Sequence, residues 1–459
     1  MSGKKRMPMT DGYRTFLIVW GGQVVSIIGS SLTWFGISIW VFLDTGSITS
    51  LAIILLASQL PRTLLSPIAG TYVDRWDRRT SMILADAGSG AATLVMIALY
   101  LTGNLTLLSL GLIAAMSGVF QAFQMPAYQA ATSLLVPKER YSQASGMIML
   151  AEAMGNLVAP ALGGIMIAIG GLGLLVAIDM VTFLIALVTL LIVRFPKPPV
   201  TKVGEASKGS VWFETKFGFL LIWNRRGLFW LLVYFATINL AFGAISPLIT
   251  AYLLSITTAS TMGIVFSLGA TGMIAGSIVA SAWRGVEHKV AAIVALGAVL
   301  GAAVGAVGVA STLPFIVLAI WVALFTVPIA GAFSQALWMR KIEPDIQGRV
   351  FAVRTAVASA AVPLSLILVG PLADRVFVPL MTGTSTLGIW LQGFFGTGLA
   401  SAYGLFFVSV GLFVVVSSMV AWSVGALRHL ERDIPDAAGL PTEIDEEVVE
   451  ATVQHEPQV

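Results

Sequence analysis

Between two long apolar runs, the sequence reads Gly70-Thr-Tyr-Val-Asp74-Arg75-Trp-Asp77-Arg78-Arg79. The flanking runs, 50–70 and 80–101, each have about the 20 residues that an α-helix needs to cross the hydrocarbon core of a bilayer. Short basic loops between such helices are typical of the cytoplasmic side of a polytopic membrane protein. The same alternation of apolar runs and basic loops continues outward from here in both directions.

The composition excludes a soluble globular protein, because 57% of the 459 residues are hydrophobic and only 11% are charged. It also excludes a disordered chain, which would be polar and rich in charge. The runs are too long for the strands of a membrane barrel, and they lack its two-residue alternation. Ten further runs predict membrane helices, at 16–42, 106–126, 141–170, 172–193, 227–254, 260–283, 290–310, 312–337, 350–372 and 401–427.

The distribution of Lys and Arg tests this count of twelve spans. With the N-terminus placed in the cytoplasm, all but three of the 26 basic residues fall in cytoplasmic segments. The exceptions are Arg62 and Arg354, which lie within spans, and Arg375, which lies outside. This asymmetry predicts a multi-pass protein of the cell membrane with both termini cytoplasmic. The first run is too long for the apolar region of a cleaved signal peptide.

The two halves resemble each other at a constant offset of 206 residues, which pairs Gly70 with Gly276 and Gly164 with Gly370. We therefore expect an all-α polytopic membrane protein with twelve transmembrane helices in two pseudo-symmetric six-helix bundles, with the substrate site between them. The expected divisions are a cytoplasmic N-terminus (1–14), the first bundle (15–194), a linker (195–226), the second bundle (227–430) and an acidic, solubilising tail (431–459).

The loop at 70–79 resembles the signature Gly-x-x-x-Asp-Arg-x-Gly-Arg-Arg/Lys of the major facilitator superfamily, with Asp77 in place of the second Gly. The resemblance implies the major facilitator fold. It also implies a gating motif in which Asp74 latches the two halves in the outward-facing state. The alternative is a loop that only anchors the topology. The motif residues are Gly70, Asp74, Arg75, Arg78 and Arg79.

The fifth run contains small residues and a proline at spacings that resemble the antiporter motif of drug:proton exporters in this superfamily. They are Gly146, Gly155, Ala159, Pro160, Gly163 and Gly164. Small residues allow helices to approach closely, and Pro160 removes one backbone hydrogen bond. The alternative is ordinary glycine-rich packing in a membrane. The stretches 60–70, 348–354 and 370–374 resemble the macrolide-efflux-type branch, which also includes siderophore exporters.

Carboxyl groups inside the spans are candidates for carrying protons, because an ionised group there costs about 2.5–3.5 kcal/mol and faces a partner or a cavity. Glu152 is the first candidate by its depth, followed by Asp179 and Asp86. Each has a structural alternative, as a satisfied polar group or as an ion pair with Arg62. Candidates for the wall of the substrate cavity are Gln23, Trp34, Phe35, Arg62, Gln121, Gln124, Asn239, Phe325 and Arg354.

These features predict a secondary transporter that exports hydrophobic or amphipathic compounds, multidrug or macrolide-like, in exchange for protons. A siderophore or lipid exporter and a nutrient:proton uptake symporter remain as alternatives. An enzyme is not expected, because the chain has no Cys and its three His residues fall outside the spans. An ATP-driven pump would need a phosphate-binding loop that the chain lacks. We expect a monomer in the lipid bilayer with no cofactor and no nucleic-acid partner, driven by the proton gradient.

Overall fold

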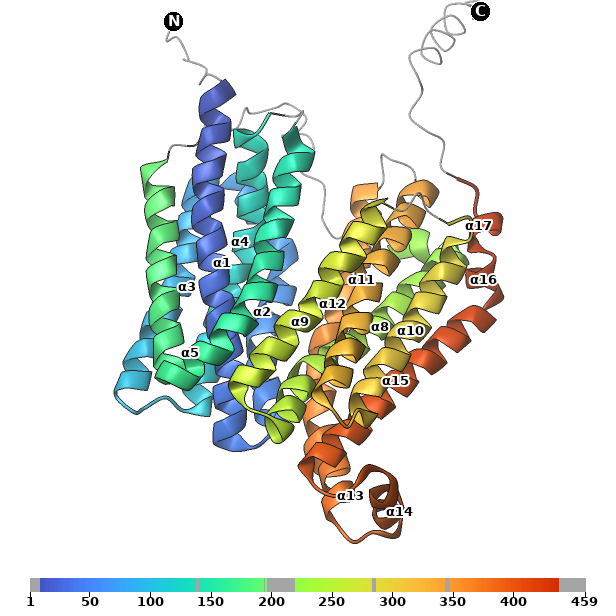
Figure 1. Cartoon of the computed structure of the whole chain (residues 1–459). Coiled ribbons are helices and arrows are strands. Elements are labelled where there is room, and N and C mark those ends of the chain that lie inside the picture. The colour runs from blue at the N-terminus through green and yellow to red at the C-terminus, as the bar shows by residue number, and fades with distance from the viewer. Residues whose placement is uncertain are drawn as a thin grey trace, which may run out of the picture.

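The computed structural model describes residues 9–137, 140–193, 195, 219–282, 286–342 and 347–436. They form two helical bundles that lie side by side (Figure 1). The first bundle contains α1 (Met9–Thr45), α2 (Ile48–Arg75), α3 (Arg78–Leu101), α4 (Leu107–Leu135) and α5 (Tyr141–Ile192). The second contains α8 (Arg226–Ile256), α9 (Ala259–Ala282), α10 (Lys289–Val309), α11 (Leu313–Lys341), α12 (Gln347–Leu372) and α15 (Leu399–Ser423).

Helix α5 reverses direction at Gly171, whose φ of 64° and ψ of −166° are not helical. Glycine adopts this left-handed φ without the clash that a Cβ would cause. Both ends of α5 consequently lie at the same end of the bundle. Near its start, the Met147 carbonyl accepts a bond from Trp20, and near its end, the Leu190 carbonyl accepts one from Arg79. The described residues contain eleven helices long and apolar enough to span a membrane, and α5 contains two crossings, so twelve crossings result.

Both described termini, Met9 and Asp436, lie at one end of the molecule, which we call the termini end; the opposite end is the far end (Figure 1). Several helices have an N-cap residue with a short polar side chain. Ser47 caps α2 at the far end by accepting from the Ser50 N–H. Asp77 caps α3 at the termini end by accepting from the Thr80 N–H at 2.9 Å. Asp77, the departure from the family signature, thus satisfies a backbone donor at a helix start.

Three features differ from what the sequence led us to expect. Helix α1 begins at Met9, inside the segment 1–14 that was expected to precede the first span. Between α12 and α15 the chain stays largely helical, in η2 (Ala373–Phe377), α13 (Val378–Thr382) and α14 (Thr386–Phe395) at the far end. The start of the acidic tail is also folded, as α17 (Leu430–Asp433), after the short helix α16 (Gly425–Arg428).

This first part of the tail packs on the termini ends of α10 and α11. The Glu431 carboxylate accepts from the Lys289 and Val290 N–H groups at 3.1 and 3.3 Å, and so caps α10. Asp436 pairs with Lys341 at 2.9 Å and with Arg340 at 2.6 Å, and the bonds from these two residues lower its pKa. Residues 437–459 of the expected tail lie outside the described residues.

The hydrophobic clusters show where the two bundles meet. One cluster crosses between them: Phe42 and Ile48 of the first bundle pack with Leu253, Met381 and Tyr403 of the second, all at the far end. The Phe42 and Tyr403 rings meet edge to face with centroids 6.3 Å apart. The clusters near the termini end each draw their described members from a single bundle. The bundles therefore pack together at the far end and separate toward the termini end.

Candidate functional site

A cavity of about 490 Å³ lies between the bundles. Eight of its nine lining residues come from α8, α11 and α12, and Gln59 comes from α2 of the first bundle. They are Gln59, Asn239, Gln335, Phe351, Arg354, Thr355, Ala358, Ser359 and Val362. The volume is within the range of small-molecule sites. The wall combines amide, hydroxyl and apolar groups, and Arg354 is its one charged member.

Arg354 is held from three sides by neutral groups of α11. Its Nη1 donates to Gln335 Oε1 at 2.7 Å, and its Nη2 lies 3.4 Å from Ser334 Oγ. The guanidinium lies over the ring of the buried Trp338, 5.4 Å from the ring centroid. A guanidinium has five N–H donors, and these two bonds use two of them. Arg354 is therefore fixed in place with donors left over beside the cavity.

Asp86 on α3 lies in a buried polar cluster inside the first bundle. Gln23 Nε2 of α1 donates to it at 2.9 Å, and Gln124 Nε2 of α4 donates at 2.8 Å. Gln124 Nε2 also lies 3.3 Å from Gln23 Oε1. The three side chains join three helices, so Gln23 and Gln124 point into the bundle in this conformation rather than into the cavity between bundles.

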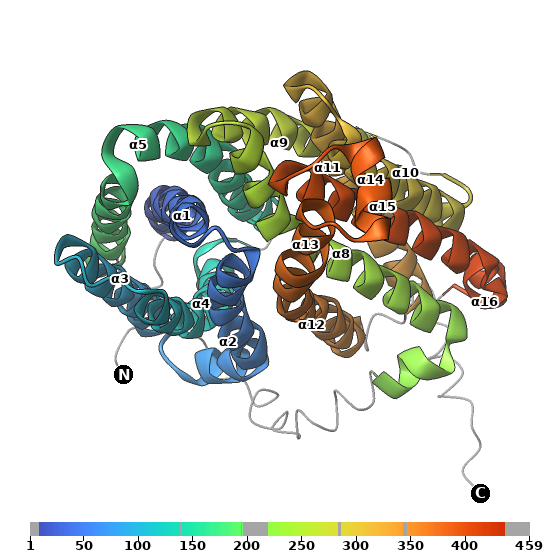
Figure 2. The same ribbon diagram turned by 90° about the horizontal axis from the view of Figure 1, so that it is seen from below.

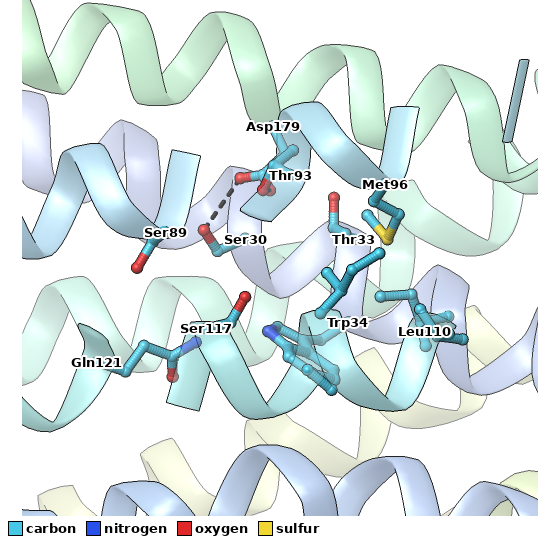
Figure 3. A pocket seen from close by; sticks show the side chains of 13 residues that line it. Ser30, Thr33, Trp34, Ser89, Thr93, Met96, Leu110, Ser117, Gln121 and Asp179 are labelled. Carbon is cyan, nitrogen blue, oxygen red and sulfur yellow. Dashed lines mark hydrogen bonds between the residues drawn. The ribbon is translucent and has the colours of Figure 1, made fainter. Parts of the chain in front are cut away.

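Asp179, in the second arm of α5, lies at the wall of a smaller cavity of about 40 Å³ within the first bundle (Figure 3). It accepts bonds from Ser30 of α1 at 3.0 Å and from Thr93 of α3 at 3.3 Å. Trp34 and Gln121, two of the expected cavity residues, also line this space. A polar cavity of this size is large enough for a water molecule.

Glu152 is exposed on the first arm of α5. At 3.6 residues per turn it shares one side of the helix with the exposed Asn156. The exposed apolar side chains Leu150, Ile165 and Ile169 lie on the opposite side, which is the side suited to lipid. Glu152 and the exposed Met149, three residues earlier, therefore lie on the side of α5 opposite these three side chains.

The small residues of the fifth run make two contacts. Gly155, Ala159 and Gly163 pack toward α1, where Gly155 lies against Ser31 and Ile27 and Gly163 against Phe35. Gly164 instead touches α9 of the second bundle, where a Cβ on Gly164 would lie 2.6 Å from the Ala259 carbonyl oxygen. Gly146 has open space around it.

Two serines of α9 join it further to α5, because Ser260 and Ser267 donate to the Gly164 and Leu157 carbonyls, each at 3.0 Å. The ring of Phe35 on α1 also meets that of Phe266 on α9, with centroids 6.0 Å apart. Phe35 therefore belongs to the junction between the bundles. Figure 2, a view from the far end, shows α5 and α9 side by side.

The second contact between the bundles joins α2 to α12. The Asp374 carboxylate, in the π-helical segment η2, accepts from Ser47 Oγ at 2.6 Å, from the Thr49 N–H at 2.9 Å and from the Ile48 N–H at 3.3 Å. One turn earlier, Gly370 lies so close to Thr49 that a Cβ would come within 2.5 Å of the Thr49 Cα. A side chain of one bundle thus caps the first turn of a helix in the other.

The gating motif is only partly described. Gly70, Asp74 and Arg75 lie at the termini end of α2, and the side chains of Asp74 and Arg75 are outside the described part of the chain. Arg78 donates to the Ala130 carbonyl of α4 at 2.7 Å, and Arg79 donates to the Leu190 and Leu191 carbonyls of α5. These two residues tie α3 to its own bundle.

Of the nine expected cavity residues, Asn239 and Arg354 line the large cavity. Phe325 stacks on Trp321 within the second bundle, with centroids 5.1 Å apart, and Arg62 is exposed on α2. Sequence reasoning missed Gln59 and the polar stripe of α12. The stripe had a signal, because the polar residues Thr355 and Ser359 are four residues apart and so share one helix face, with the apolar Phe351 one turn earlier. Within the described residues, no group of three His, Asp or Glu side chains could hold a metal ion.

Comparison with known proteins agrees with this architecture. The sequence model of the Major Facilitator Superfamily matches residues 19–366, more than half of the chain. The chain belongs to the major facilitator superfamily. It is 29% identical to macrolide efflux protein A of Streptococcus pyogenes over 386 residues, which cover 80% of this chain and 92% of that protein. It is 32% identical to the enterobactin exporter EntS of Salmonella typhimurium over 136 residues, 29% of this chain and 32% of the exporter.

Solved structures of this superfamily share the fold. A bacterial homologue of the human lysosomal transporter Spinster, in an inward-facing and unoccupied conformation, has a TM-score of 0.72 at 14% identity, covering 95% of this chain and 100% of that one. A mutant of the nucleoside transporter NupG has a TM-score of 0.70 at 12% identity, covering 89% of this chain and 100% of that one. Superfamily membership identifies this chain as a multi-pass transporter of the cell membrane with a small-molecule substrate. Such transporters are in general not enzymes and need no cofactor.

Proposed function

We propose that this transporter exports hydrophobic or amphipathic small molecules, multidrug or macrolide-like, in exchange for protons by alternating access. The observation that carries the proposal is a cavity of about 490 Å³ bordered by both bundles, which pack together at the far end and separate toward the termini end. With both termini cytoplasmic, as the basic residues indicate, this is the inward-facing state. A substrate would enter from the cytoplasm and leave after the far end opens.

The direction of transport is supported by the relatives. Macrolide efflux protein A covers most of the chain, and the enterobactin exporter matches part of it. The second of these favours a siderophore-type compound as the alternative substrate. The small residues of α5 also suit an exporter, because they let α5 pack closely against both α1 and α9, which resists leakage through the closed far end.

The proton would bind a carboxyl group that changes its exposure during the cycle. Glu152 is exposed on the side of α5 opposite Leu150 and Ile165, on the same helix that contacts the other bundle. Asp86 and Asp179 are buried and satisfied by neutral donors, which suits a structural role in this conformation. Asp179 has the stronger claim of the two, because its cavity could admit water.

The test is transport in proteoliposomes under an imposed pH gradient, with N-phenylnaphthylamine as an uncharged fluorescent probe. We expect Glu152→Gln to abolish gradient-driven transport while probe binding remains. The matched control is Asn156→Ala, one turn along the same face, which keeps the carboxyl group. Full gradient-driven transport by the Glu152→Gln variant would show that Glu152 does not carry the proton. A transport rate of the unaltered protein that does not depend on the pH gradient would refute proton coupling.

A further inference from the structure

The large cavity carries one charge that nothing in the proposed mechanism uses. Arg354 lines the cavity, and of the nine residues that border it, the other eight are amides, hydroxyls or apolar groups. Within the described part of the chain, the partners of its guanidinium are Gln335, Ser334 and the ring of Trp338, all of them neutral. Among the described residues, the positive charge is therefore held near the start of α12 by neutral partners alone.

Such a placement is costly unless it serves a ligand. An uncompensated cation in a span faces a cavity and marks the path of a substrate or an ion. Here the guanidinium is also oriented in advance. Gln335 and Ser334 take two of its five N–H donors, and Trp338 supports its face. A guanidinium fixed in this way binds a carboxylate, sulfonate or phosphate through two parallel bonds.

We propose that Arg354 is the anion-recognition point of the substrate site, and that the transporter selects amphipathic compounds with one acidic group. The acidic group binds the guanidinium, while Phe351, Ala358 and Val362 provide apolar wall for the rest of the compound. Gln59 borders the same cavity from α2, so a compound bound at Arg354 reaches both bundles. This inference rests on the proposed export function and narrows its substrates to acidic amphipathic compounds, which disfavours macrolide-like compounds that carry a basic amine.

The cavity also disfavours the opposite charge. A cationic compound in the same position would meet the like charge of Arg354 at short range, where the low-dielectric surroundings screen it weakly. Neutral compounds of equal shape keep the apolar contacts but gain nothing from the guanidinium. The expected order of affinity among compounds of one skeleton is therefore anion, then neutral compound, then cation.

The test uses two fluorescent probes that share one skeleton and differ by a sulfonate group, anilinonaphthalene sulfonate and uncharged N-phenylnaphthylamine. Binding to the purified protein in lipid nanodiscs is measured for each, with empty nanodiscs subtracted. We expect Arg354→Gln to weaken sulfonate binding by about tenfold or more, the loss of one charge-assisted contact, and to change neutral-probe binding by less than about twofold. Arg354→Lys keeps the positive charge but cannot form two parallel bonds to the sulfonate, so its affinity for the sulfonate probe should lie between those of the unaltered protein and Arg354→Gln.

The control is Arg375→Gln, which removes a positive charge from an exposed position at the far end, outside the cavity. It should leave both probes unaffected. Retained binding of the neutral probe shows that the Arg354 variants are folded. Equal loss of both probes, or no loss of sulfonate binding, overturns the inference. The export function is tested separately, by gradient-driven transport of the neutral probe in Arg354→Gln. If this transport continues while the binding results overturn the inference, the substrate class is wrong and the export function stands.

Discussion

The contact of Asp374 with the first turn of α2 predicts that Asp374→Asn shifts the protein out of the conformation seen here. The carboxylate accepts three bonds across the junction, two of them from backbone N–H groups at a helix start. Asparagine has one acceptor oxygen and no charge, so it cannot reproduce this arrangement. The variant therefore weakens the junction at the far end and favours the state in which that end is open.

The magnitude follows from the lost interactions. A hydrogen bond to a charged group contributes about 1.5–3 kcal/mol. A negative charge at a helix N-terminus adds about 0.3–1 kcal/mol. Because Asp374 is partly exposed, solvent screens both contributions, and a net change of about 1–2 kcal/mol is reasonable. The ratio of the two conformations should then change by roughly 5- to 30-fold.

The absence of Cys from the chain makes this measurable, because spin labels can be attached at introduced cysteines without background. Gln143 and Ala282 are suitable positions. Both are exposed, near the termini ends of α5 and α9, the two helices that touch at the far end. In Asp374→Asn, the distance distribution between the labels should gain a shorter component as the termini end closes.

The control is Arg375→Gln, which changes the charge of the adjacent, exposed residue and keeps the Asp374 carboxylate. Ser47→Ala tests the same junction from the other side, since Ser47 donates to Asp374 and also caps its own helix. In the double variant the combined effect should be smaller than the sum of the two, because both changes remove the bond between Ser47 and Asp374. If the distance distribution of Asp374→Asn matches that of Arg375→Gln, the contact of Asp374 with α2 does not hold the two bundles together at the far end.

Two further predictions concern packing. Gly164→Leu should shift the same label pair toward the shorter distance, because a side chain at this position collides with α9. Gly146→Leu, in the same motif but in open space, should leave the distance unchanged. Equal effects of the two variants would contradict the contact between Gly164 and α9. Asp86→Leu should lower the thermal unfolding midpoint in detergent, because it leaves the buried amide of Gln23 without its acceptor, at about 1–3 kcal/mol, and removes one of the two acceptors of the half-buried Gln124. Asp86→Asn keeps an acceptor oxygen and should cost less, and an equal loss would show that the charge itself matters.

The sequence predicted the fold well because membrane insertion depends on features that are local in the chain. Runs of about 20 apolar residues, together with the distribution of Lys and Arg among the connecting segments, were enough to define twelve crossings, including the two that α5 joins through Gly171. Helix α14 was missed because ten residues are too few to register as a span. The folded start of the tail was missed because composition alone does not show that Glu431 can cap α10.

The site was less predictable, because depth along a helix can be counted but rotation about its axis depends on packing. Gln23 and Arg354 were both recognised as polar residues inside spans. Only the structure shows that Gln23 turns into its own bundle toward Asp86, while Arg354 lines the cavity. Gln59 was overlooked because a single amide in an apolar run gives no sign of which neighbour it faces.

The position of α12 suggests how binding at the cavity reaches the far end. Arg354 lies near its start, and Asp374 lies in the helical segment that continues it, 20 residues later and so about 30 Å away. A ligand shifts a conformational equilibrium only by the difference in its affinity for the two states. A compound that bridges Arg354 and Gln59 has such a difference, because in the proposed alternating-access cycle the two side chains belong to bundles that move relative to each other. Since Arg354 lies in α12 and Asp374 in its continuation η2, a shift of this helical unit changes the cavity wall and the junction together.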